Sequence, residues 1–229
     1  MGDYRGVLFE LDDLSYTRAG AVVIRGLSGR LPAGACCIAG PSGSGKSTLL
    51  RLLNRLADPD SGRVLYEGAD VRDREVLALR REVCLVPQLP ALLEGTVEDN
   101  IRFAAGCAER EPEVARLLGL SGLDESFAAR DASRLSVGEQ QRAMLARSLA
   151  LEPRVLLLDE PTSALDEDAR DAVEATLADL RGRLGISTVV VTHDLFQARR
   201  MSDWLLQVDE GRAVAEGPTS DLLDRVAAS

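Results

Sequence analysis

The order of hydrophobic and polar positions predicts strands in the first part of the chain. Short apolar runs are separated by polar or glycine-containing turns, which is the pattern of β-strands. We expect strands at 7–11, 21–24, 27–31, 35–39, 62–68 and 83–86. Helical spacing of the apolar residues predicts helices at 49–57 and 74–81.

From about residue 89 to 152 the strand pattern disappears, and helices are expected at 97–105, 112–118 and 137–149. Further elements follow, with strands at 155–158, 187–192, 204–208 and 213–216 and helices at 166–181 and from about 220. We therefore predict a single α/β domain over residues 1–229, with a mostly parallel sheet, flanking helices and a small N-terminal antiparallel β-subdomain. The core and β-subdomain occupy about 1–88 and 153–229, and a helical subdomain is inserted at about 89–152.

The composition argues against nucleic acid as a non-specific partner and against a membrane-spanning chain. Hydrophobic residues make up 45% of the chain and charged residues 28%, which is typical of a globular protein. The formal net charge of −10 argues against non-specific nucleic-acid binding, although a local basic patch is compatible with it. No apolar run approaches the ~20 residues that span a bilayer, and residues 1–5 lack the pattern of a signal peptide. We therefore expect a cytoplasmic protein that reaches a membrane only through a partner.

The cysteines show no C-x-x-C spacing, and Cys36, Cys37 and Cys84 fall in predicted core strands. We interpret these three and Cys107 as small buried hydrophobic residues rather than as disulfides or metal ligands.

A glycine-rich segment between a predicted strand and a predicted helix matches the pattern G-x-x-x-x-G-K-[ST] from Gly40 to Ser47. Glycine lets the backbone N–H groups approach an anion, and the next helix directs its positive end at the same point. A glycine-serine turn that only caps a helix is the alternative, but the flanking strand and helix favour a phosphate loop. Lys46, the only lysine, is expected to reach the β- and γ-phosphates, and Ser47 to bind Mg²⁺. The expected nucleotide-binding residues of this segment are Gly40, Pro41, Ser42, Gly43, Ser44, Gly45, Lys46, Ser47 and Thr48.

Polar side chains follow three buried strands at the edge where α/β sheets bind ligands. Asp159 is suited to hold the same Mg²⁺ as Ser47, and Glu160 points elsewhere and could polarise an attacking water. Gln88 could contact Mg²⁺ or its water, or lie in a solvated loop. His193, the only histidine, could bond the γ-phosphate or that water, although a lone histidine is commonly structural.

Two helix starts and one aromatic residue complete the candidates. Ser136 and Glu139 form a capping-box pattern, and a helix that begins with Ser136 and Gly138 is also an anion site, so both interpretations can hold together. Asp166 is a candidate N-cap for the helix at 166–181. Tyr16 either stacks on an adenine or packs in its sheet.

Together these segments resemble the ATP-binding-cassette (ABC) ATPases over essentially the whole chain. The motifs, in chain order, are Walker A at 40–47, the Q-loop glutamine Gln88, the signature motif at 135–141, Walker B with its glutamate at 155–160, the D-loop at 163–166 and the switch histidine His193. Their common order makes the resemblance far more specific than any one motif.

The resemblance implies a P-loop NTPase core and Mg²⁺-dependent hydrolysis of ATP, with Glu160, His193 and Lys46 as the catalytic residues. It also implies a dimer with a second ABC ATPase subunit, expected to be an identical chain. Each ATP would lie between the P-loop side of one subunit and Ser136 and Gly138 of the other, while Asp166 and Tyr16 complete the nucleotide site. Tyr16 falls where the family keeps its adenine-stacking aromatic residue, which favours stacking over plain packing. Closure around ATP and reopening after hydrolysis would drive the partner.

The signature motif departs from the usual LSGGQ. Val137 replaces the first glycine and Glu139 replaces the glutamine. Ser136 and Gly138 remain, so the contact with a γ-phosphate is retained in this interpretation. Glu139 brings a negative charge near the phosphates held by the partner.

Two functions fit these features. The first is the ATPase subunit of a transporter with separate transmembrane permease subunits, bound peripherally to the inner face of the cell membrane. Residues 92–101 lie where the family docks a coupling helix, and this run resembles exporter-like cassettes and a group associated with metal or other small-solute transport. The second is a soluble cassette ATPase that acts on nucleic acid or ribosomes. Because those relatives usually carry two cassettes or long inserted arms, and this chain has one cassette and an acidic balance, we expect no nucleic-acid partner. A nucleotide-binding scaffold without turnover is disfavoured by the presence of both Glu160 and His193.

Overall fold

The computed structural model describes residues 6–227, and its strands form two sheets. The residues on which the signal-peptide expectation depends, 1–5, lie outside the described part. The first sheet is antiparallel, in the order β2-β1-β4-β5, and consists of β1 (Val7–Arg18), β2 (Ala21–Pro32), β4 (Ser61–Tyr66) and β5 (Ala69–Asp70).

The strands predicted at 21–24 and 27–31 are one strand, β2. The register with β1 shifts between Leu14, which faces Leu27, and Ser15, which faces Arg25. Gly26, with φ of +61°, is the additional residue of this β-bulge, and its N–H donates to Ser15 Oγ at 3.1 Å. A bulge bends a strand without ending it, so the interrupted hydrophobic pattern was wrongly interpreted as a break.

The second sheet has the order β10-β9-β3-β8-β7-β6 and is parallel apart from the β9–β10 hairpin. Its strands are β3 (Ala35–Ala39), β6 (Val83–Val86), β7 (Val155–Asp159), β8 (Ser187–Thr192), β9 (Trp204–Asp209) and β10 (Arg212–Pro218). Every residue of β3, β7 and β8 is buried, as expected of central parallel strands covered on both faces. The chain leaves these three neighbouring strands at the same edge, so the segments that follow them lie close together.

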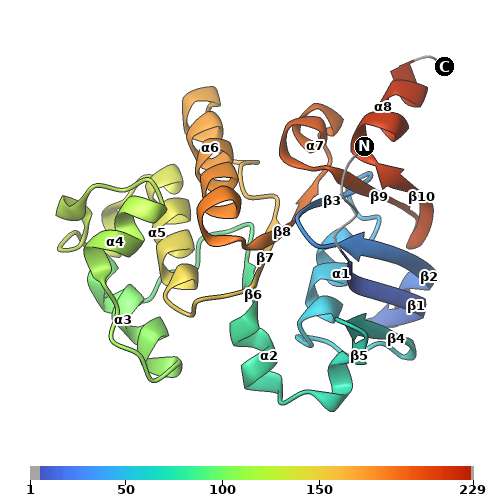
Figure 1. The fold of residues 1–229 in the computed structure, drawn as a ribbon, viewed down its shortest axis with the longest axis horizontal. Helices are drawn as coiled ribbons and strands as arrows, with labels where there is room; N and C mark the ends of the chain where they lie inside the picture. Colours follow the sequence, from blue (N-terminus) through green and yellow to red (C-terminus); the bar gives the residue numbers. More distant parts are fainter. Residues whose placement is uncertain (1–5, 228–229) are drawn as a thin grey trace.

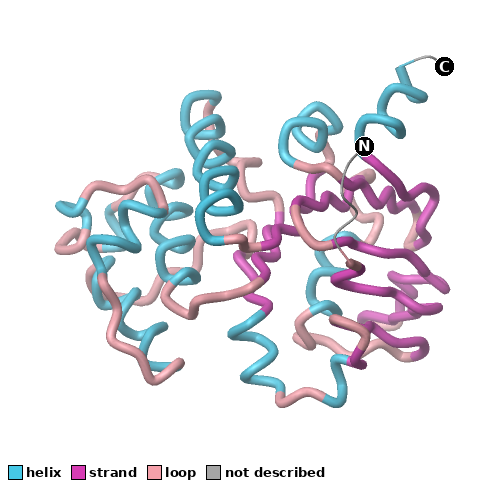
Figure 2. Tube along the Cα trace, viewed as in Figure 1, coloured by secondary structure: helices cyan, strands magenta, loops and turns pink. Residues whose placement is uncertain are grey.

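The helices are α1 (Lys46–Leu53), α2 (Val76–Glu82), α3 (Val97–Cys107), α4 (Val114–Leu120), α5 (Val137–Leu149), α6 (Glu167–Leu184), α7 (Leu195–Met201) and α8 (Thr219–Ala227). Figure 1 shows α3, α4 and α5 grouped on the left, away from the antiparallel sheet on the right. Figure 2 shows this left-hand group as helices and loops, and it lies in the segment between β6, which ends at Val86, and β7, which begins at Val155. Helix α7 was not predicted, and α1 begins at Lys46 rather than at residue 49.

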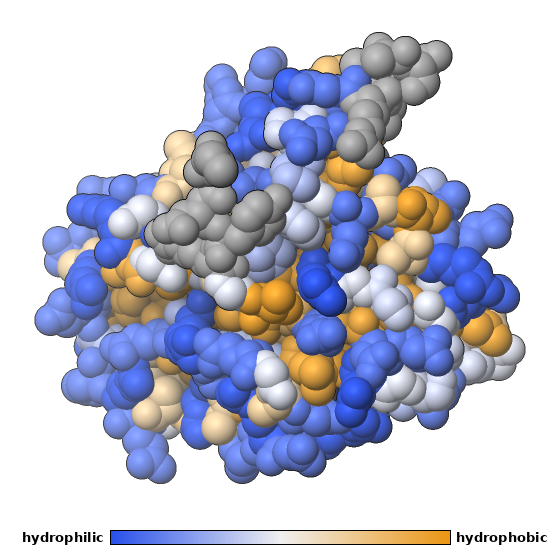
Figure 3. Space-filling model, turned by 45° about the vertical axis from the view of Figure 1, so that its right-hand side comes forward, coloured by the Kyte–Doolittle hydropathy of each residue, from blue (hydrophilic) through white to orange (hydrophobic). Residues whose placement is uncertain are grey.

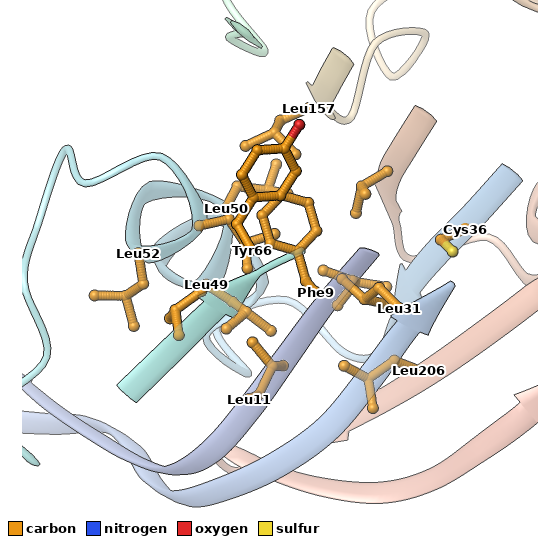
Figure 4. Packing of buried hydrophobic residues seen from close by; sticks show 14 of the residues in the cluster. Phe9, Leu11, Leu31, Cys36, Leu49, Leu50, Leu52, Tyr66, Leu157 and Leu206 are labelled. Atoms are coloured by element: carbon orange, nitrogen blue, oxygen red, sulfur yellow. The ribbon is translucent and has the colours of Figure 1, made fainter. Parts of the chain in front are cut away.

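One hydrophobic cluster joins both sheets to α1. The rings of Phe9 and Tyr66 stack with their centroids 5.0 Å apart, and Leu49 and Leu50 of α1 lie beside them (Figure 4). Leu157 of β7 belongs to the same cluster, so α1 is anchored between the antiparallel and the parallel sheet. The helical subdomain has its own cluster, formed largely by α3, α4 and α5.

The surface of the sheet-bearing side is mainly hydrophilic, with hydrophobic residues visible near its middle (Figure 3). Among the described residues, none of the helices has the length and apolar character to cross a membrane. Cys36, Cys37 and Cys84 are buried as predicted, whereas Cys107 is exposed at the end of α3, so the prediction was wrong for that cysteine.

Candidate active site

The glycine-rich loop between β3 and α1 has a backbone that only glycine accommodates at two points. At Gly40 (φ +156°) a Cβ would lie 1.9 Å from the carbonyl oxygen of Val208. Gly45 caps α1 in a left-handed conformation, with φ of +104°, and a Cβ there would lie 2.8 Å from Cδ1 of Ile24. The loop is therefore pressed against β9 and β2, with Pro41, Ser42, Gly43 and Thr48 in the same segment and the first turn of α1.

The ammonium group of Lys46 lies inside this loop. The side chain is buried, and Nζ donates to the carbonyl oxygens of Gly40 at 2.8 Å and Pro41 at 2.7 Å. Burial lowers the pKa of Lys46, and the nearby carboxylates of Glu160 and Asp159 act in the opposite direction. An ammonium group has three donors, so one remains for an anion in the loop.

The hydroxyl of Ser44 offers a test of whether this loop fits a phosphate. The residue is 4% exposed, and its Oγ has no hydrogen-bond partner among the residues that the structure describes. A buried hydroxyl without a partner is costly in a folded protein. A phosphate oxygen supplies the missing acceptor, so the loop fits the group that its sequence predicts.

Ser47 and Asp159 meet where α1 begins and β7 ends. Ser47 Oγ donates to Asp159 Oδ1 at 2.8 Å. Burial raises the pKa of Asp159, and the hydrogen bond from Ser47 opposes that rise. A hydroxyl and a carboxylate beside a phosphate loop are oxygen ligands of the kind that Mg²⁺ prefers. Among residues 6–227, no group of three or more His, Cys, Asp or Glu side chains is arranged to hold a metal ion.

Glu160 is held in a conformation that non-glycine residues rarely adopt. Its φ is +45°, and its N–H donates to the carbonyl oxygen of Val191 in β8 at 3.1 Å. Backbone strain of this kind costs about 1–3 kcal/mol and is concentrated at functional sites. The two adjacent carboxylates have different partners: Ser47 donates to Asp159, whereas Gln88 and His193 contact Glu160.

Two predicted residues, Gln88 and His193, converge at the Glu160 carboxylate. His193 Nδ1 lies 3.3 Å from Oε1, and Gln88 Nε2 donates to Oε2 at 3.3 Å. Gln88 also donates to Ser163 Oγ at 3.2 Å. Ser163 was not among the predicted site residues, although it begins the D-loop segment that the sequence singled out.

A buried polar network behind this cluster was missed altogether. Gln197 Nε2 donates to Thr162 Oγ1 and, at 3.1 Å, to Glu174 Oε1. A cavity of about 90 Å³ beside it is lined by Gln197 and Thr162 and also by Glu160 and His193. Gln197 lies on α7, which was not predicted, so nothing in the sequence pattern placed it near the site.

Tyr16 is partly buried and packs against the hydrophobic cluster that joins both sheets to α1, so plain packing is part of its role. It pairs across the ladder with Ile24, the residue that approaches Gly45. Opposed residues of an antiparallel pair lie on the same face of the sheet. Adenine stacking by the partly exposed Tyr16 ring stays a prediction that this position supports.

The signature residues lie away from the phosphate loop in the folded chain. Ser136 and Gly138 belong to the start of α5, and Figure 1 shows α5 and α1 on opposite sides of α6 and β7. The predicted capping box is present, because Ser136 Oγ accepts from Glu139 N and the Glu139 carboxylate accepts from Ser136 N. Asp166 caps α6 by accepting from Ala169 N at 2.9 Å, also as predicted.

A phosphate loop after β3, an aspartate at the end of β7, which is the next strand but one, and a clustered glutamate define a P-loop nucleotide-hydrolase domain. The sequence model of the family described as "ABC transporter" matches residues 24–163 of this chain. The chain belongs to the ABC transporter family.

Three curated relatives show how far this similarity extends. Protein STAR1 of Oryza sativa subsp. japonica is 45% identical over 207 residues, covering 89% of this chain and 60% of its own length. ABC transporter I family member 17 of Arabidopsis thaliana is 44% identical over 207 residues, with coverage of 89% and 79%. Fe(3+) ions import ATP-binding protein FbpC of Pseudomonas fluorescens is 39% identical over 219 residues, with coverage of 93% and 62%. The chain thus spans less than two thirds of the length of STAR1 and of the iron-import protein, and more than two thirds of the length of the Arabidopsis thaliana protein.

Solved structures agree with the fold. CbiO1 of Clostridium perfringens, described as part of the ABC transporter complex cbiONQ, has a TM-score of 0.87 and 27% identity over 98% of this chain and 93% of that one. A dimeric ATP-binding cassette in a post-hydrolysis state with bound ADP and Pi has a TM-score of 0.80 and 27% identity, with coverage of 92% and 98%. The predicted α/β P-loop fold and the assignment to the ABC ATPases are confirmed, and ATP is the nucleotide of this class.

Proposed function

We propose that the chain hydrolyses ATP as one half of a cassette dimer and drives separate transmembrane permease subunits. The convergence of Gln88 and His193 on the Glu160 carboxylate carries this proposal. A nucleotide-binding scaffold would not need a strained glutamate held by an amide and an imidazole.

The residues divide the work of hydrolysis between them. Lys46 and the loop amides hold and neutralise the phosphates, and Glu160 accepts the proton of the attacking water. Gln88 and His193 orient that carboxylate and the groups around it. Mg²⁺ would be held by Ser47 and Asp159, with Gln88 as a further oxygen ligand in this proposal, and its charge would stabilise the negative charge that develops on the transferred phosphoryl group.

The second half of the site comes from another subunit in this proposal. Ser136 and Gly138 lie on α5, away from the phosphate loop of their own chain, so they are available to the ATP of a partner. Asp166 lies at the start of α6 and completes the nucleotide site in this proposal. The dimeric cassette structure with ADP and Pi supports this arrangement, and two identical chains are the simplest dimer.

The membrane partner binds beside the Q-loop in this proposal. Leu89 and Leu93, which follow Gln88, are 75% and 43% exposed, and Phe103 of α3 is 59% exposed. These residues offer apolar contacts to a coupling helix at the inner face of a membrane, which would place the chain there as a peripheral cytoplasmic subunit. The similarity to the iron-import relative favours a metal ion or another small solute as cargo.

The proposal is tested by recovering the partner. Tagged Glu160→Gln protein is incubated with ATP and Mg²⁺ in detergent-solubilised cells of its source, and bound proteins are identified by mass spectrometry. A multi-spanning membrane protein retained with the variant, and not with Lys46→Ala, is the expected result. Recovery of ribosomal proteins or nucleic acid instead would favour the alternative, a soluble cassette ATPase.

A further inference from the structure

The signature segment carries a negative charge where the family motif has a neutral amide. Glu139 replaces that amide one residue after Gly138. If the proposed dimer is correct, this carboxylate lies near the phosphates of an ATP bound to the partner. Like charges at such a distance weaken binding.

The Glu139 carboxylate is turned back onto its own helix. Oε2 accepts from Ser136 N at 2.8 Å, and Glu139 N donates to Ser136 Oγ at 3.3 Å. The Ser136 backbone N–H contributes most to lowering the pKa of Glu139, and the Ser136 side chain adds to this effect, so the carboxylate stays ionised at neutral pH.

An arginine from a different part of the subdomain faces this carboxylate. Arg130 Nη1 lies 3.6 Å from Glu139 Oε1. The guanidinium lies 3.7 Å from the ring centroid of Phe127, which packs against the hydrophobic cluster of the subdomain. The backbone of Arg130 is held as well, since its N–H donates to Phe127 O and its carbonyl accepts from Val97 N, both at 3.0 Å. The arginine is therefore positioned before any ligand arrives, which reduces the entropy cost of the ion pair.

Other charges near Glu139 are arranged differently. Arg142, one turn further along α5, also lowers the pKa of Glu139, but no ion pair joins the two side chains among the described residues. Arg134 is 85% exposed in its side chain and pairs with Asp131 at 3.5 Å. Arg130 is thus the arginine that meets the carboxylate directly.

We propose that Arg130 is a positioning residue that neutralises Glu139, so that the signature segment can accept the phosphates of the partner-bound ATP despite its acidic residue. This inference rests on the proposed dimeric ATPase. Arg130 and Glu139 act as a unit, which replaces the neutral amide of the usual motif by a neutral pair of charges.

The test is a double-mutant cycle on ATP turnover, with KM and kcat measured for wild type, Arg130→Ala, Glu139→Gln and the double variant. We expect Arg130→Ala to raise KM about two- to fivefold, the range for a partly exposed charge pair. Glu139→Gln should match or improve on wild type, and the double variant should behave as Glu139→Gln alone. Arg134→Ala is the matched control and should leave KM within error of wild type.

The outcomes separate the inference from the proposed function. If Arg130→Ala raises KM as much in the Glu139→Gln background as in wild type, Arg130 does not act through Glu139 and the inference is overturned. Rescue by Glu139→Gln also excludes a merely structural loss, because a damaged fold would not recover. A wild-type protein that neither hydrolyses ATP nor dimerises would overturn the proposed function, and the inference with it.

Discussion

The buried amide of Gln197 allows a quantitative test of how the catalytic edge is held together. The side chain is 5% exposed and donates both to Thr162, two residues beyond Glu160, and to Glu174. Glu174 also accepts two hydrogen bonds from Arg200, each at 2.8 Å. Replacing Gln197 by Glu keeps the size of the side chain and removes its donors.

The magnitude follows from the distance between Gln197 Nε2 and Glu174 Oε1. Two like charges at 3.1 Å repel by about 5 kcal/mol at an effective dielectric constant of ~20. Protonation of one carboxylate limits this cost, and Arg200 offsets part of it. We therefore expect Gln197→Glu to lower the free energy of unfolding by about 3 kcal/mol near neutral pH, including the lost hydrogen bonds.

The loss should depend on pH in a stated direction. In the native protein burial raises the pKa of Glu174, but the hydrogen bonds from Arg200 and Gln197 outweigh it and lower that pKa overall. In the variant the added carboxylate raises the pKa of the folded pair above the value in the unfolded chain. The destabilisation is then fully present above the raised folded pKa and is relieved as the pH falls through it.

Urea unfolding of wild type, Gln197→Glu and Gln197→Leu at about pH 8 and about pH 5 measures this effect. Gln197→Leu loses the same hydrogen bonds without adding a charge, so its difference from wild type should change little with pH. A Gln197→Glu variant as stable as wild type at the higher pH would refute the reasoning. The reasoning would also be refuted if lowering the pH reduced the stability difference between Gln197→Glu and wild type no more than the difference between Gln197→Leu and wild type.

Three further substitutions test individual roles in the site. Lys46→Ala should weaken ATP binding at least tenfold, which corresponds to about 1.4 kcal/mol of binding free energy. If the variant bound a fluorescent ATP analogue with wild-type affinity, Lys46 would not be a phosphate-binding residue. Asp159→Asn should keep nucleotide binding but raise the Mg²⁺ concentration needed for half-maximal turnover about tenfold or more, and an unchanged Mg²⁺ titration would remove it from the metal site. His193→Ala should lower kcat about 10²-fold with KM little altered, and unchanged turnover would make His193 a structural residue.

Local patterns in the sequence predicted much of the fold. The runs at 155–158 and 187–192 are hydrophobic throughout because β7 and β8 are covered on both faces. The capping box joins Ser136 and Glu139, which are only three positions apart, so its pattern is visible in the sequence alone. Because β3, β7 and β8 are neighbours in the sheet, the motifs after them had to meet at one edge.

Interactions between distant segments could not be predicted in this way. Gln197 and Thr162 are 35 residues apart, and their contact depends on α7, which has too few residues for a clear helical period. Arg130 reaches Glu139 because hydrogen bonds to Phe127 and Val97 fix a loop without regular structure. In both cases tertiary packing decides which polar residues meet.

The molecular mass of Glu160→Gln protein in solution with ATP and Mg²⁺ tests the account most directly. The substitution removes the proposed base while keeping the size of the side chain, so bound ATP should persist and hold two chains together. Light scattering after size exclusion should give twice the chain mass of 24.6 kDa with ATP and the mass of a single chain with ADP. A single-chain mass with ATP shown to be bound would contradict a site completed by Ser136 and Gly138 of a second subunit.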